Sequence, residues 1–211
     1  MKNIKKKAVI FDCDEILLDH LGGFVNYVKK YYDIETKGNP VQYHLQDWLQ
    51  CDGEQVMDLL KNFNFYSYEF GLLEPMDQYT VPSMKALRTE FPDVAFIIVT
   101  KSGTFGHGEV LRKVNLINVF GDIFDDIIIL ENYQSKRATY AKLKEQYNVL
   151  TVVDDHLANI DVANELGLDT VVLDCTHNRG QLQANGDEYN IMMDWQEMYY
   201  YLYQTLACDT E

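Results

Sequence analysis

The sequence predicts an α/β fold in which a parallel sheet lies between two layers of helices. Short runs rich in β-branched residues recur along the chain, and segments with helical periodicity separate them. The runs are continuous rather than alternating, which is typical of strands that are covered on both faces. Because strands and helices alternate, we expect right-handed βαβ crossovers. The predicted core is therefore a Rossmann-like, three-layer αβα arrangement.

Apolar runs and helical patterns define the expected elements in order. Strands are expected at residues 8–11, 94–99, 127–130, 149–153 and 170–173. Helices are expected at residues 82–90, 107–116, 136–147 and 157–166. After the last run, a polar stretch contains the turn signal Asn185-Gly186, and an amphipathic pattern over residues 195–206 predicts a final helix packed on the sheet.

An insertion of roughly 80 residues separates the first two runs, although a crossover needs only a helix and its turns. Its apolar residues recur at helical spacing: Leu18, Leu21, Val25 and Val28, then Val56, Leu59, Leu60 and Phe63. We expect most of its aromatic residues in the core of a small helical subdomain and a few at a cleft: Tyr27, Tyr31, Tyr32, Tyr43, Trp48, Phe63, Phe65, Tyr66, Tyr68 and Phe70. The predicted division is a core domain of residues 1–14 and 81–211 and a helical cap of residues 15–80.

Composition narrows the classes of partner. The chain has 211 residues and a net charge of −15, so the phosphate backbone of a nucleic acid polymer would be repelled. The four cysteines lie far apart and form no C-x-x-C pair, which suits a reducing compartment. No segment approaches the ~20 apolar residues that a membrane span needs. We therefore expect a cytoplasmic protein that binds neither nucleic acid polymers nor membranes.

Polar residues follow the expected strands at the edge where ligands bind in open parallel sheets. They are Asp12 and Asp14 after the first run, Thr100, Lys101 and Ser102 after the second, Lys136 at the helix after the third, and Asp154 and Asp155 after the fourth. Two pairs of carboxylates at one edge would repel each other unless a divalent cation neutralised them. Oxygen donors without histidine or cysteine favour Mg²⁺, which also accepts phosphate oxygens. The hydroxyl of Thr100 and the ammonium of Lys136 suit the remaining oxygens of a phosphoryl group.

Four segments together resemble, in order, the motifs of the haloacid dehalogenase superfamily of phosphatases. They are FDCDEILLD, IIVTKSG, Lys136 within SKRATYAKL, and VVDDHLANIDVANELGL, and the resemblance spans residue 7 to about residue 173. It implies that Asp12 is the nucleophile that becomes an aspartyl phosphate. It also implies that Asp14 protonates the leaving oxygen and then takes a proton from the attacking water. The insertion resembles the cap that many members place over the site.

The resemblance extends to phosphate and metal binding. Phosphoryl oxygens are expected on Thr100, Lys101, Ser102 and Lys136. Mg²⁺ is expected on Asp12, Asp14, Asp154 and Asp155, with the backbone carbonyl of Asp14 as the usual contribution of that residue. Asp155 would act directly or from just outside the coordination shell.

Two departures and several simpler interpretations accompany this assignment. Glu15 stands where such phosphatases usually have glycine, which is expected to alter the turn and the metal affinity. Arg137 follows Lys136, and we favour Lys136 as the cation that faces phosphate. His156 and His177 lie near strand ends, but a lone histidine is more often structural, so both are left out of the site.

Other simple interpretations concern the acidic residues themselves. Asp12 and Asp14 alternatively end a solvated strand, and Asp154 and Asp155 alternatively cap the helix that begins near His156, a role that Asp155 can combine with one in the site. Asn159 either orients an aspartate or is an ordinary exposed amide. These alternatives require no ligand at the strand ends.

The expected function is Mg²⁺-dependent removal of phosphate from a small phosphorylated metabolite through an aspartyl phosphate. The VVDD motif and the helical cap are most similar to the 5′-nucleotidase branch, which favours a nucleoside monophosphate as substrate. A sugar phosphatase and a phosphotransferase of the same superfamily are alternatives. A catalytically silent binding or regulatory protein is a further alternative, because of Glu15. The sequence does not predict an oligomeric state.

Overall fold

The computed structural model describes residues 5–38, 45–185 and 188–208. In this part of the chain, one parallel sheet has the strand order β3-β2-β1-β4-β5-β6. The strands are β1 (Lys7–Phe11), β2 (Ala95–Thr100), β3 (Asp126–Ile129), β4 (Asn148–Asp154), β5 (Thr170–Leu173) and β6 (Ile191–Met192). The predicted parallel α/β fold is confirmed, and β6 is an additional short edge strand.

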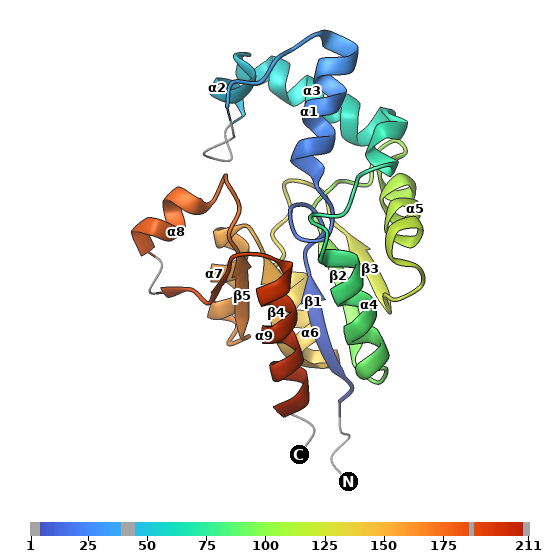
Figure 1. Ribbon diagram of the computed structural model, residues 1–211, viewed down its shortest axis with the longest axis vertical. Helices are drawn as coiled ribbons and strands as arrows, with labels where there is room; N and C mark the ends of the chain where they lie inside the picture. The colour runs from blue at the N-terminus through green and yellow to red at the C-terminus, as the bar shows by residue number, and fades with distance from the viewer. Residues whose placement is uncertain (1–4, 39–44, 186–187, 209–211) are drawn as a thin grey trace.

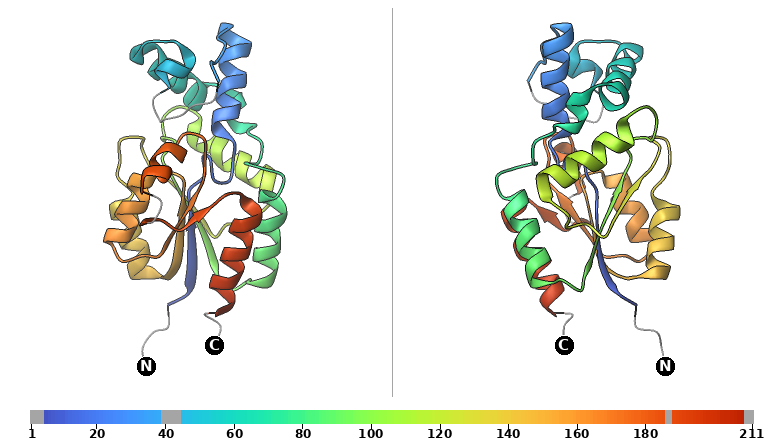
Figure 2. Two further views of the ribbon diagram at one scale, coloured as in Figure 1. Left: turned by 60° about the vertical axis from the view of Figure 1, so that its left-hand side comes forward. Right: turned by 90° about the vertical axis from the view of Figure 1, so that its right-hand side faces the viewer.

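Helices cover both faces of the sheet (Figures 1 and 2). One face carries α4 (Thr80–Glu90), α5 (Gly108–Phe120) and α9 (Trp195–Cys208), and the other carries α6 (Arg137–Gln146) and α7 (Leu157–Glu165). In β1, Val9 and Phe11 pack in the first layer while Ala8 and Ile10 pack in the second. Because successive side chains of a strand point to opposite faces, a strand buried on both sides must be apolar throughout.

The insertion forms helices beyond the carboxyl ends of the strands, at the top of Figure 1. They are α1 (His20–Tyr32), α2 (Gln46–Leu49), α3 (Gly53–Tyr66) and the short 3₁₀ helix η1 (Tyr68–Gly71). The Asp19 and Asp52 side chains cap α1 and α3 by accepting hydrogen bonds from backbone N–H groups of their first turns. Leu18 is buried but precedes α1 rather than belonging to it. The limits of the cap domain at residues 15 and 80 stay a prediction.

Two features of the chain differ from expectation. Of the ten aromatic residues named above from the insertion, four are buried, Phe65 is half-buried and four are exposed: Tyr27, Trp48, Phe63 and Phe70, against Tyr31, Tyr32, Tyr66 and Tyr68. A thin helical layer buries only the rings that face inward, and tyrosine tolerates water at its hydroxyl. Tyr43 lies outside the described residues. The polar stretch after β5 contains the helix α8 (Arg179–Asn185), and Gly186 is also outside the described residues.

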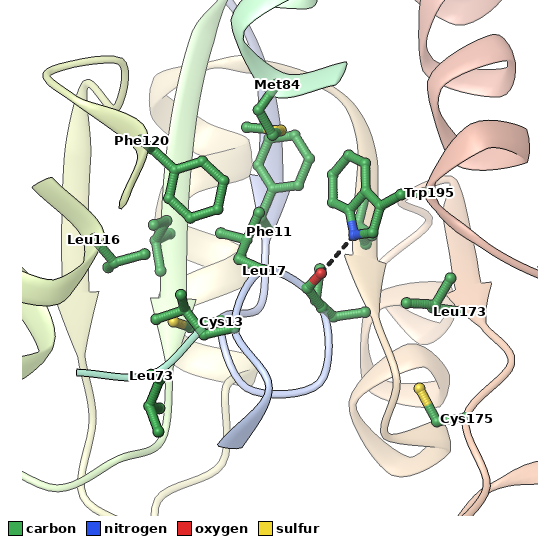
Figure 3. Packing of buried hydrophobic residues seen from close by; sticks show 14 of the residues in the cluster. Phe11, Cys13, Leu17, Leu73, Met84, Leu116, Phe120, Leu173, Cys175 and Trp195 are labelled. Atoms are coloured by element: carbon green, nitrogen blue, oxygen red, sulfur yellow. Dashed lines mark hydrogen bonds between the residues drawn. The ribbon is translucent and has the colours of Figure 1, made fainter. Parts of the chain in front are cut away.

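The loop after β1 is anchored by the C-terminal helix. Trp195, at the start of α9, is fully buried, and its indole N–H donates to the carbonyl oxygen of Ile16 (Figure 3). Its ring stacks on Phe11 with 6.5 Å between ring centroids. This loop carries the acidic residues that follow β1, so α9 fixes their position. No helix in the described residues is long and apolar enough to cross a membrane.

Candidate active site

The acidic residues meet because β1 and β4 are neighbours. Phe11 pairs with Val153, so Asp12 and Asp154 leave the two strands at the same level. The Asp12 amide donates to the Val153 carbonyl over 2.8 Å, which extends the pairing beyond β1. Oxygen atoms of Asp12, Asp154 and Asp155 lie within 4.8 Å of one another, and all three residues are buried. Asp12 therefore does not end a solvated strand.

Lys136 lies inside this acidic cluster. Its Nζ atom is 3.0 Å from Oδ2 of Asp12 and 2.7 Å from Oδ2 of Asp154, and its side chain is fully buried. Burial alone would lower the pKa of Lys136, but the two carboxylates hold it well above its usual value. Arg137 is half-exposed and pairs with Glu165 on the surface. Of the two neighbouring cations, the structure brings Lys136 to the site.

The cluster carries more negative than positive charge. Burial raises the pKa of Asp12 to about 8; Lys136 opposes this shift, while Asp154, Asp155 and Asp14 add to it. Asp12, Asp154 and Asp155 face the single ammonium of Lys136. A divalent cation fits both this charge imbalance and the oxygen donors present.

Asp154 is held by four donors. Its Oδ1 accepts from the His156 amide at 2.9 Å and from Nδ2 of Asn159 at 3.1 Å. Its Oδ2 accepts from Lys136 at 2.7 Å and from the Tyr140 hydroxyl at 3.3 Å. Asn159 is buried and orients Asp154, which resolves its two interpretations. The four bonds use both lone pairs of each oxygen, so Asp154 is rigidly oriented.

Asp155 is held by residues that follow β5. His177 is buried, and its Nε2 atom is 2.7 Å from Oδ2 of Asp155. Nδ2 of Asn178 donates to the Asp155 backbone carbonyl at 2.8 Å. Sequence reasoning set His177 aside as a lone histidine, although its position just after an expected strand was an available signal.

A cavity of about 230 Å³ opens above these groups, between the sheet and the insertion. Its wall includes Asp12, Asp14, Glu15, His20, Leu21, Leu45, Thr100, Lys101, Asp155, His156, Asn159 and His177. Thr100 and Ser102 are buried, and among the described residues their hydroxyl oxygens have no hydrogen-bond partner. A buried hydroxyl without a partner costs free energy unless a ligand or water completes it. The Thr100 hydroxyl therefore offers a donor at the cavity wall, whereas Ser102 is not among the residues that line the cavity.

The Asp14 side chain contacts Arg112 rather than joining the cluster of the other three acids. Its Oδ1 atom accepts a hydrogen bond from Nη2 of Arg112 on α5, and its side chain is 26% exposed. Among the described residues, the metal-compatible cluster contains the other three predicted acids but not the Asp14 carboxylate. Arg112 was not anticipated from the sequence.

Glu15 adopts the backbone conformation that explains why glycine is usual at its position. Its φ of 58° lies in the left-handed region, where a side chain is unfavourable. The carboxylate is buried, and its Oε1 accepts from the Leu21 amide in the first turn of α1 at 2.8 Å. Burial raises the pKa of Glu15 well above its usual value. The departure thus supplies an additional cap to α1 beside Asp19.

The fold and the acidic cluster at the carboxyl edge of the sheet together define a class of protein. It is a parallel α/β protein with a buried acidic site beneath a helical insertion. No family model matches the chain. It is 24% identical over 173 residues to an uncharacterised 32.4 kDa protein from the Gp30-rIII intergenic region of Enterobacteria phage T4. The match covers 76% of this chain and 58% of the phage protein, so the chain spans little more than half of that relative.

Solved structures of low sequence identity share the fold. A haloacid dehalogenase-like hydrolase from Streptococcus pneumoniae superposes with a TM-score of 0.64 at 15% identity, covering 96% of this chain and 100% of that one. A Bacteroides vulgatus protein provisionally named a β-phosphoglucomutase gives 0.61 at 14% identity, with 98% and 91% coverage. A Lactobacillus delbrueckii protein provisionally named a phosphoglycolate phosphatase gives 0.60 at 15%, with 93% and 98% coverage. The chain has the haloacid dehalogenase-like fold.

Proposed function

We propose that the protein is a Mg²⁺-dependent phosphohydrolase that acts on a small phosphorylated metabolite through an aspartyl phosphate at Asp12. The observation that carries this proposal is the position of Lys136, within 3.0 Å of Asp12 and 2.7 Å of Asp154 in a buried acidic cluster. The hydroxyl of Thr100 supports it, because it lines the cavity, has no partner among the described residues and suits a phosphoryl oxygen. The names of the structural neighbours point to the same chemistry.

The residues present fit a magnesium ion. Asp12 and Asp155 would hold it together with the backbone carbonyl of Asp14. Asp154 already accepts four hydrogen bonds, one of them from Asn159, so we assign it mainly to orienting Lys136. When bound, the cation would offset the excess negative charge and polarise a phosphoryl oxygen.

The chain's own residues then divide the reaction into two steps. In the first, Asp12 attacks phosphorus, the ester P–O bond breaks, and the leaving oxygen takes a proton from Asp14. In the second, Asp14 takes a proton from water as the water oxygen attacks phosphorus, which releases inorganic phosphate and regenerates Asp12. Thr100 donates to the phosphoryl oxygens, and Lys136 offsets the charge that develops in both steps.

The substrate class is a small phosphate monoester. The VVDD motif and the helical cap favour a nucleoside monophosphate, while the names of two structural neighbours favour a sugar phosphate or phosphoglycolate. His20, Leu21 and Leu45 from the insertion line the cavity, so they would meet the part of the substrate that is not phosphate. Transfer to an acceptor other than water and silent ligand binding are the competing functions.

Phosphate release from a panel of nucleotides, sugar phosphates and phosphoglycolate tests the proposal, with Mg²⁺ and with a chelator. We expect turnover in the wild type that is lost in Asp12→Asn and with chelator, and that persists in Asp93→Asn, which changes an exposed aspartate outside the site. No turnover on any substrate would contradict the proposal and favour a binding protein. Phosphate transfer to a sugar, without free phosphate, would identify a phosphotransferase.

A further inference from the structure

Arg112 is a buried arginine whose one ion pair among the described residues is with Asp14. Its side chain has no exposed surface, and Nη2 donates to Oδ1 of Asp14. The guanidinium lies over the ring of Phe70 in η1, 4.2 Å from the ring centroid. Within the described residues, its Nε and Nη1 atoms have no hydrogen-bond partner. Burying a guanidinium with most of its donors unused is unfavourable, so the contact with Asp14 requires an explanation.

Arg88 shows what a structural arginine looks like in this chain. Its guanidinium also lies 4.2 Å from the centroid of a phenylalanine ring, that of Phe96. Its nitrogen atoms donate to the backbone carbonyls of Ile123 and Val94, and it pairs with Asp125. Arg88 therefore joins segments of backbone, whereas Arg112 donates to no backbone carbonyl in the described part of the chain. Its polar contact is with a side chain of the cavity wall.

The contact restricts Asp14. Asp14 lines the same cavity as Asp12, and it keeps 26% of its side chain exposed although Arg112 is completely buried. Because Oδ1 is engaged by Arg112, proton exchange with a substrate falls to Oδ2. A carboxylate held at one oxygen by a buried and immobile donor keeps the other oxygen in one direction.

We propose that Arg112 is a positioning residue that orients the Asp14 carboxylate for proton transfer. This rests on the proposed function, because it assigns Arg112 a part in the same reaction. The Arg112 guanidinium contributes through Asp14 alone and does not touch the substrate. Phe70 belongs to the insertion, so the helical layer supports the orientation of Asp14 through the ring on which Arg112 lies.

A double-mutant comparison tests the proposal with Mg²⁺ present, using p-nitrophenyl phosphate and adenosine 5′-monophosphate. We expect Arg112→Met to lower kcat by about 100-fold on the nucleotide, with KM changed less than about twofold. The loss should be smaller on p-nitrophenyl phosphate, whose leaving oxygen needs little protonation. Arg112→Lys, which keeps the charge, should recover part of kcat. In the Asp14→Asn background, Arg112→Met should cause no further loss.

Arg88→Met is the matched control, because it also removes an arginine stacked on phenylalanine and paired with aspartate. It should leave kcat within about twofold on both substrates. Additive losses in the double variant, or equal losses in Arg88→Met and Arg112→Met, would overturn the positioning role. If Arg112→Met does not fold by circular dichroism, the same comparisons use Arg112→Lys, and unchanged kcat in that variant on both substrates overturns the positioning role of the guanidinium.

A wild type without turnover on the whole panel is a different result, since it overturns the proposed function and with it the role of Arg112 in turnover. Urea unfolding of the two single variants and the double variant then decides on the pairing itself. For a direct contact, we expect the change in unfolding free energy of the double variant to differ from the sum of the changes in the two single variants. Equality of the two would show that Arg112 and Asp14 are not coupled in solution.

Discussion

Phe11 on β1 pairs with Val153 on β4, and this register places Asp12 and Asp154 side by side at the carboxyl edge of the sheet. The two residues are 142 positions apart in the chain. Lys136 contacts both carboxylates, so three distant segments meet in one buried cluster. Three predictions concern this site and the loop after β1, and a fourth concerns Asp125, which pairs with Lys6 just before β1.

Lys136→Met should lower kcat for phosphate release by about 100- to 1,000-fold, because the charge that offsets the phosphoryl group is lost. Arg137→Met is the matched control. It removes the next cation along the chain, which pairs with Glu165 on the surface, and should change kcat less than about twofold. Steady-state kinetics on folded variants decides between them. A loss confined to Arg137→Met would assign the phosphate to the other cation.

Thr100→Val should reduce kcat/KM by about 10- to 100-fold while changing the free energy of unfolding by no more than about 1 kcal/mol. The Thr100 hydroxyl has no partner among the described residues, so its removal costs the folded protein little. Thr151→Val is the control, since the Thr151 hydroxyl on β4 is likewise buried without a described partner. Kinetics and urea unfolding are measured together. If both variants lose activity equally, the hydroxyl of Thr100 has no special role.

Glu15→Gly should be more stable than Glu15→Ala by about 1 kcal/mol, because only glycine adopts a φ of 58° without strain. Both variants lose the hydrogen bond to the Leu21 amide, so Glu15→Ala should fall below the wild type by about 1 kcal/mol or more. Chemical denaturation measures both differences. Equal stability of the two variants would contradict the strained backbone at this position.

Asp125→Asn should lower the free energy of unfolding by about 1–2 kcal/mol at pH 7. Partial burial raises the Asp125 pKa, but Lys6, the Phe96 amide and Arg88 together hold it below its usual value. A lowered pKa stabilises the folded state above the pKa of the unfolded chain. That contribution is lost as the pH falls through the folded-state pKa.

The difference in unfolding free energy between Asp125→Asn and the wild type should therefore narrow as the pH falls below the usual aspartate pKa of about 4. Urea unfolding at several pH values measures it. The exposed Asp93→Asn variant is the control and should differ little from the wild type at any pH. A difference in unfolding free energy that stays constant as the pH falls would contradict the link between the ionisation of Asp125 and stability.

The sequence was informative where one local pattern determines structure. β1 and β4 are buried on both faces, so their apolar runs and the acids that end them were visible without any tertiary information. β6 has only two residues and α8 is polar, so neither produced a pattern that periodicity detects. The exposed tyrosines of the insertion line a cleft, in keeping with the expectation that a few of its rings lie at one. Which rings these are could not be predicted, because ring content alone does not tell which face of a thin layer a residue occupies.

The acidic cluster and Lys136 were predicted because parallel topology brings strand ends to one edge. The contact between Arg112 and Asp14 was not, since it joins a helix to a loop 98 positions earlier. The local signal was a charged residue among the buried residues of α5, which also include Leu116 and Phe120. A charged residue in a helix can be predicted to be buried only when the partner of its charge is known. His177 was missed because its contact with Asp155 depends on the turn after β5.

The hydrogen bond from the Trp195 indole to the Ile16 carbonyl has a consequence for biosynthesis. The acids of β1 leave the ribosome first, yet the loop that carries them gains its anchor only when residue 195 has been translated and α9 has docked. The acidic residues of this loop should therefore reach their final positions only after residue 195 has emerged and α9 has docked.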